Sequence, residues 1–130
     1  MSGYRTLSLA DTRTVGYDTG AAWLPLRTDL GITAFGFNAW RADQGQEVIE
    51  RHVEGDHQEA YVVVEGAARF TVGEDDIDAP AGTVIFIEDP TLERVGIAEQ
   101  DDTLVLAIGA EKGKVFEPSD WEERELAKRG

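Results

Sequence analysis

The sequence predicts an all-β protein, a sandwich or barrel of short strands. Strand-length segments rich in Val, Ile, Thr and aromatic residues recur along the chain, clusters of Gly, Asp and Pro separate them, and one segment alone has the features of a helix. Short strands at even spacing with turn signals between them are typical of sandwiches and barrels. The expected strands are 22–26, 32–40, 47–53, 60–64, 67–72, 83–87 and 103–108.

Turn-forming residues bound these strands. Segment 22–26 is apolar around Trp23, segment 32–40 follows the turn cluster 29–31, and segment 47–53 follows a similar cluster. Gly and Asp favour the backbone conformations of turns, so each cluster marks the end of a strand.

A tight hairpin is expected at Glu65 and Gly66. Only these two residues separate Val64 from the strand 67–72. A two-residue turn needs a positive φ, which Gly66 adopts without steric cost. Segments 61–64 and 67–72 are therefore predicted to pair with each other.

Alternation along the later strands predicts an apolar outer face as well as an apolar interior. If Glu59 points into the barrel, Tyr61 and Val63 point inward with it, because side chains alternate between the faces of a strand. The residues between them are also apolar, and segments 83–87 and 103–108 repeat the pattern. Such a face must be covered by the N-terminal strands or by a second subunit, so a homodimer is expected.

One short helix is expected from Ser119 to about Lys128. Ser119 is a typical N-cap residue and Glu122 follows three positions later, which is the pattern of a capping box. Its apolar residues are mainly Trp121 and Leu126. The helix is therefore expected to lie on the barrel as a lid or brace.

Length and composition favour one soluble domain spanning 1–130. The chain has 130 residues, a net charge of −14 and no cysteine. The acidic charge argues against nucleic-acid binding, which needs a basic surface. No apolar stretch is long enough to span a membrane, and residues 1–10 lack the features of a secretory signal, so a cytoplasmic location is expected. Without cysteine, any metal must be held by His and carboxylates.

The chain's only histidines, His52 and His57, lie with Glu54 and Glu59 in one short segment. A cluster of imidazoles and carboxylates is what a metal site or a general acid–base site needs. Glu59 is the strongest candidate, because a carboxylate within an apolar strand needs a partner or has a raised pKa. Tyr61 is expected on the same face.

This cluster belongs to a stretch that matches a known motif, G-x5-H-x-H-x(3,4)-E-x6-G. Gly45 opens the stretch one residue early and Gly66 closes it. His52 takes the first histidine place, Glu54 the second and Glu59 the glutamate place. With these residues the chain resembles the cupin family of small β-barrels.

A second cupin motif, G-x5-P-x-G-x2-H-x3-N, follows. Gly73 is one residue early, and Pro80 and Gly82 match. Ile85 takes the histidine place and Asp89 the asparagine place, so the resemblance covers about 45–89, after N-terminal strands in 1–44. It implies a cupin-type double-stranded β-helix, or jelly-roll barrel, with a short C-terminal helix.

The resemblance also implies a metal site, although two of the four usual ligands are changed. His52, Glu54 and Glu59 are the expected ligands, with His57 as a replacement for the imidazole that Ile85 removes. Fe, Mn, Zn or Ni are the candidate metals, and a set with one imidazole and two carboxylates favours Mn or Fe(II).

A metal-free site is the alternative. Glu59 and His52 are then the catalytic residues, a general base and acid acting on a small carbonyl compound, sugar or hydroxylated acid. Tyr61 and Ile85 are expected to line the substrate pocket. A barrel that binds a small molecule, or serves as a scaffold, without catalysis is the remaining reading, because cupins host many functions.

Overall fold

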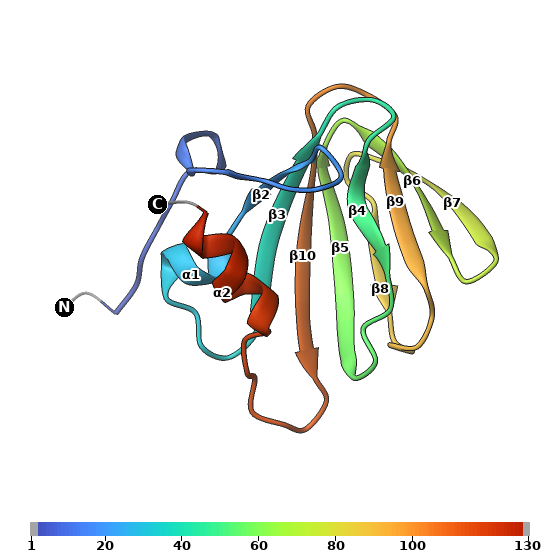
Figure 1. Ribbon diagram of the computed structural model, residues 1–130. Coiled ribbons are helices and arrows are strands. Elements are labelled where there is room, and N and C mark those ends of the chain that lie inside the picture. The colour runs from blue at the N-terminus through green and yellow to red at the C-terminus, as the bar shows by residue number, and fades with distance from the viewer. Residues whose placement is uncertain (1–2, 129–130) are drawn as a thin grey trace.

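Two antiparallel sheets face each other in the computed structural model, which describes residues 3–128 (Figure 1). One sheet has the strand order β1-β2-β3-β10-β5-β8, and the other has the order β4-β9-β6-β7. Residues 1–2 and 129–130 of the predicted domain lie outside the described part.

The elements, in chain order, are η1 (Leu9–Asp11), β1 (Val15–Gly16), β2 (Ala22–Leu24), α1 (Leu26–Leu30), β3 (Gly36–Ala42), β4 (Glu47–His52), β5 (His57–Glu65), β6 (Ala67–Val72), β7 (Asp75–Pro80), β8 (Val84–Ile87), β9 (Arg94–Ala98), β10 (Thr103–Glu111) and α2 (Asp120–Ala127).

The prediction of an all-β fold is confirmed, and each expected strand has a counterpart, most of them with shifted ends. Segment 67–72 has its predicted bounds, whereas 22–26 is strand only to Leu24, because Pro25 is the N-cap residue of α1. Strands β1, β7 and β9 were not expected. β7 contains three aspartates, which strands disfavour, and it forms because it pairs along its whole length with β6.

The predicted hairpin between β5 and β6 is wrong. β5 pairs with β10 and β8, whereas β6 pairs with β7 and β9 in the other sheet. The chain crosses between the sheets at Gly66, whose φ is 76°. A Cβ atom there would lie 2.5 Å from the hydroxyl oxygen of Thr103, so the crossing requires glycine. The two-residue turn lies instead at Gly73, between paired Val72 and Asp75.

The sheets enclose an inner core, and a second apolar cluster covers part of the outer face. Val105 and Ala107 of β10 point inward, whereas Leu104 packs outside against Leu24 and Leu26. The N-terminal region therefore covers this part of the face, as one of the two expected alternatives. At the β8 edge the outer face is open: Val84 is 62% and Phe86 is 59% exposed.

Helix α2 begins after Ser119 as predicted, but the capping box does not form. The side chain of Ser119 makes no cap hydrogen bond. The carboxylate of Glu122 is buried and accepts hydrogen bonds from Nη2 and Nε of Arg27, at 2.5 and 3.1 Å. The ring of Trp121 packs on Trp23 with centroids 4.9 Å apart. These contacts hold α2 beside α1 and β3, as Figure 1 shows.

Loss of this ion pair is expected to destabilise the docked helix. Glu122→Ala leaves the Arg27 guanidinium half-buried without its partner, so the free energy of unfolding should fall by about 2 kcal/mol. Chemical denaturation measures the change. The matched control is Glu123→Ala on the exposed side of the same helix, which should change stability little. Equal losses in the two variants would contradict a docking role for Glu122.

Candidate functional site

A pocket of about 360 Å³ opens into the barrel beside α2. Its lining includes His52 and Glu54, which lie at and just after the end of β4, and Glu59 from β5. Tyr61 also lines it, two residues further along β5 and on the same face. The β5 alternation therefore directs Glu59 and Tyr61 inward, as predicted.

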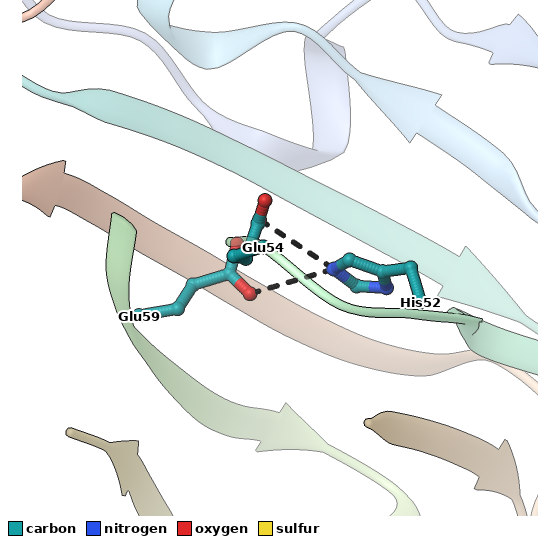
Figure 2. A group of neighbouring side chains, drawn as sticks. All are labelled: His52, Glu54 and Glu59. Carbon is teal, nitrogen blue, oxygen red and sulfur yellow. Dashed lines mark ion pairs between the residues drawn. The ribbon is translucent and has the colours of Figure 1, made fainter. Parts of the chain in front are cut away.

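His52 lies between the two carboxylates (Figure 2). Its Nε2 atom is 3.5 Å from Oε1 of Glu54 and 3.7 Å from Oε1 of Glu59. Its other ring nitrogen, Nδ1, lies 2.5 Å from the backbone oxygen of Glu50. Both nitrogens thus face acceptors, an environment that stabilises the doubly protonated imidazolium.

Arg94 lies behind Glu59 and was not predicted as a site residue. Its fully buried guanidinium donates from Nη1 to Oε1 of Glu59 at 3.1 Å, and its other nitrogens donate to the backbone oxygens of Leu92 and Pro90. The hydroxyl of Tyr61 also donates to Oε1 of Glu59. A lone basic residue at the start of the apolar segment 94–98 was the available sequence signal.

The cluster shifts several pKa values. Burial by itself lowers the pKa of His52, but hydrogen bonds to Glu54 and Glu59 outweigh it and raise the pKa to about 10. Burial raises the pKa of Glu54, but hydrogen bonds with His52 and Glu59 bring it below its usual value. Burial, and then the charge of Glu59, raise the pKa of Tyr61 well above its usual value. At neutral pH His52 is therefore a cation and Glu54 a carboxylate.

The remaining candidate residues lie apart from this group. Nδ1 of His57 is 3.1 Å from a carboxylate oxygen of Asp56, and its ring lies 6.1 Å from that of Phe116. His57 does not line the main pocket but lines two other cavities, of about 70 and 600 Å³, and Glu54 and Glu59 also line the smaller one. Ile85 pairs with Tyr61 in the β5–β8 ladder and packs in the inner core, without lining the main pocket.

The spacing of His52, Glu54 and Glu59 is compatible with a metal ion. One possible ligand atom from each residue lies within 4.8 Å of the others. Within residues 3–128, no other set of three or more His, Asp or Glu side chains lies this close together. These three residues are therefore able to hold a metal. The donor set, one imidazole and two carboxylates, suits a hard divalent cation. Arg94 and the His52 proton compete with the ion for the same carboxylates, so metal binding must release that proton.

Comparison with known proteins identifies the fold. A cupin protein from Bacteroides fragilis is 22% identical over 92% of this chain and 93% of its own, with a TM-score of 0.68. A sugar phosphate isomerase of the cupin superfamily from Silicibacter pomeroyi is 21% identical over 83% of this chain and 76% of its own, with a TM-score of 0.68. A predicted oxalate decarboxylase from Thermotoga maritima is 16% identical over 82% of this chain and 99% of its own, with a TM-score of 0.66.

These similarities show that the chain has the cupin fold, which confirms the architecture implied by its two motifs. No family model and no curated protein sequence matches the chain. The solved relatives differ in the activities that their names state, so the fold leaves the reaction open. In the described part of the chain, no helix has the length and apolar character needed to cross a membrane.

The charge on His52 gives a direct test of the site geometry. Because its folded-state pKa is raised from 6.5 to about 10, its contribution to stability is complete below pH 6.5 and is lost as the pH rises through about 10. An NMR titration of the imidazole should show the cation at pH 8. Glu54→Gln should lower this pKa, and the exposed control Glu74→Gln should not. A midpoint near 6.5 in the unaltered protein would contradict the arrangement.

Proposed function

We propose that this protein is an acid–base enzyme that moves a proton on a small carbonyl or hydroxylated compound bound in the barrel pocket. The observation that supports it best is the pairing of His52 and Glu54, a donor and an acceptor 3.5 Å apart on the pocket wall. Proton transfer next to a carbonyl group needs both, one to remove a proton from carbon and one to stabilise the oxygen.

The hydrogen bonds suggest how the roles are divided. Oε1 of Glu59 already accepts hydrogen bonds from Arg94 and Tyr61, so this oxygen is engaged within the protein. Glu54 has a more exposed side chain, 26% against 13% for Glu59. We therefore assign proton removal to Glu54 and proton donation to His52. Glu59 then acts mainly as a positioning residue, a change from the role that the sequence suggested.

Metal-assisted chemistry at the same residues is the second candidate. His52, Glu54 and Glu59 would hold one divalent ion, with Fe, Mn, Zn and Ni as the candidates and Mn or Fe(II) favoured by the donor set. A bound ion would supply a Lewis acid that polarises a carbonyl oxygen. A barrel that binds its ligand without catalysis is the third reading.

Proton exchange in deuterated water tests these proposals. The protein, purified without chelator or nickel resin and analysed for metals, is incubated with small hydroxyaldehydes and hydroxyketones. Loss of the α-proton signal is followed by NMR. The acid–base proposal predicts exchange by metal-free protein, with Glu54→Gln or His52→Gln slowing it roughly 10²- to 10⁴-fold. Glu74→Gln, in the exposed β6–β7 turn, serves as the control and should retain the full rate.

Other results of the exchange assay would favour the metal-assisted enzyme or the binding barrel. Exchange that depends on added Mn(II) or Fe(II), with stoichiometric metal lost in His52→Gln, would favour the metal candidate. No exchange with or without metal would contradict both enzyme proposals and favour a binding barrel.

We also propose that the protein is a homodimer formed through the open part of its outer face. Val84 and Phe86 on β8 are exposed and pair with Val62 and Ala60 of β5, which gives an apolar surface at the sheet edge. Light scattering should give twice the mass of the chain. The double variant Val84→Glu/Phe86→Glu should give the monomer mass with its fold retained, because both side chains lie outside the core. A monomeric unaltered protein would contradict the proposal.

A further inference from the structure

Three aromatic rings from distant parts of the chain meet in the main pocket. Tyr17 follows β1, Trp40 lies in β3 and Trp121 lies in α2, and all three line the pocket. The centroid of the Tyr17 ring lies 4.9 Å from that of Trp40 and 6.4 Å from that of Trp121, with interplanar angles of 75° in both pairs. We call these three residues the aromatic box.

Trp23 packs against two members of the aromatic box, Trp40 and Trp121. Trp23 is fully buried and stacks on Trp40 with centroids 6.2 Å apart, and it contacts Trp121 at 4.9 Å. Its indole nitrogen donates to Oδ1 of Asn38 at 2.9 Å, which fixes the ring. The rings of Trp40 and Trp121 lie 31° from parallel, with Tyr17 across them. The pocket thus has preformed aromatic walls.

Negative charge accompanies the aromatic box. Glu50 lines the same pocket, and its carboxylate interacts with the hydroxyl of Tyr17 through charge and a hydrogen bond. Burial first, and then the charge of Glu50, raise the pKa of Tyr17 to about 12, so its ring remains a neutral phenol. Electron-rich ring faces beside a carboxylate attract an organic cation, especially an alkylated ammonium group.

The pocket offers little to an anion. His52 is the only basic side chain among its described lining residues, and both of its nitrogens face acceptors within the protein. The guanidinium of Arg94 is buried behind Glu59, and its donors are engaged by Glu59 and backbone oxygens. A phosphate or carboxylate group would therefore meet Glu50 and Glu54 without an unpaired cation to compensate.

We infer that the pocket selects a small organic cation, an alkylated ammonium compound that also carries a hydroxyl or carbonyl group. The ammonium group lies against the pocket-facing side of the aromatic box, beside Glu50, and the oxygen-bearing end reaches His52 and Glu54. This inference rests on the proposed function in one respect, that this pocket is where the small molecule binds.

Choline and two compounds of similar shape test the charge preference. Isothermal titration compares choline with 3,3-dimethylbutan-1-ol, in which carbon replaces the charged nitrogen, and with 3,3-dimethylbutanoate, which is an anion. Choline should bind roughly tenfold or more tightly than the neutral alcohol, because cation–π attraction and the Glu50 carboxylate favour only the cationic ligand. The anion 3,3-dimethylbutanoate should bind more weakly than the alcohol.

Two variants locate the binding. Trp121→Leu removes one wall of the aromatic box and should weaken choline binding roughly tenfold. Because Trp121 also docks α2, Glu50→Gln provides an independent test with an exposed side chain, and it should weaken choline binding several-fold while leaving the neutral alcohol unchanged. Phe86→Leu, an exposed aromatic position on β8 outside the pocket, is the control and should have no effect.

The outcomes separate this inference from the proposed catalysis. Absence of choline binding, or alcohol or carboxylate binding as tight as that of choline, overturns the cation preference whatever the exchange assay shows. Unchanged choline affinity in both Trp121→Leu and Glu50→Gln also overturns it, because binding would then lie elsewhere. Choline binding that both variants weaken, in a protein without exchange activity, supports the cation site and contradicts the enzyme proposal alone.

Discussion

Arg94 carries the only fully buried guanidinium in the described chain, and Glu59 is the one carboxylate that it meets, at 3.1 Å. A charge in such a place is costly unless it is paired and hydrogen-bonded, and the backbone oxygens of Leu92 and Pro90 complete its shell. This cation therefore lies behind Glu59 as its ion-pair partner inside the barrel. On its other side Glu59 shares His52 with Glu54, at 3.7 and 3.5 Å.

This ion pair also joins the two sheets. Glu59 belongs to β5 in one sheet and Arg94 to β9 in the other, where Arg94 is paired in register with His52 of β4. The sheets are therefore tied together directly at the pocket floor. The aromatic part of the pocket lining rests on Trp23, against which Trp40 and Trp121 pack. The pocket is thus charged where proton transfer is proposed and aromatic where a cation is proposed to bind.

The extent to which the sequence predicts this arrangement depends on how local each feature is. Alternation within single strands indicated the inward direction of Glu59 and the two faces of β10, because side-chain direction has a period of two. The resemblance to the cupin motif grouped His52, Glu54 and Glu59 as candidate ligands, and the three side chains do lie together. Strand pairing is not local, and the apparent hairpin at Gly66 proved to be a crossing between sheets. Arg94 and the aromatic box were missed because their partners lie far away in the sequence.

A double-mutant cycle on Arg94 and Glu59 tests this account most directly, with chemical denaturation as the measurement. Arg94→Met removes the buried cation of this ion pair and leaves Glu59 with only Tyr61 and His52 as partners, so it should lower the free energy of unfolding by about 3–5 kcal/mol. Adding Glu59→Gln removes the partner carboxylate and should restore a large part of the loss, giving a coupling energy of about 2 kcal/mol. A small effect of Arg94→Met, or costs that simply add in the double variant, would contradict the central place of this ion pair.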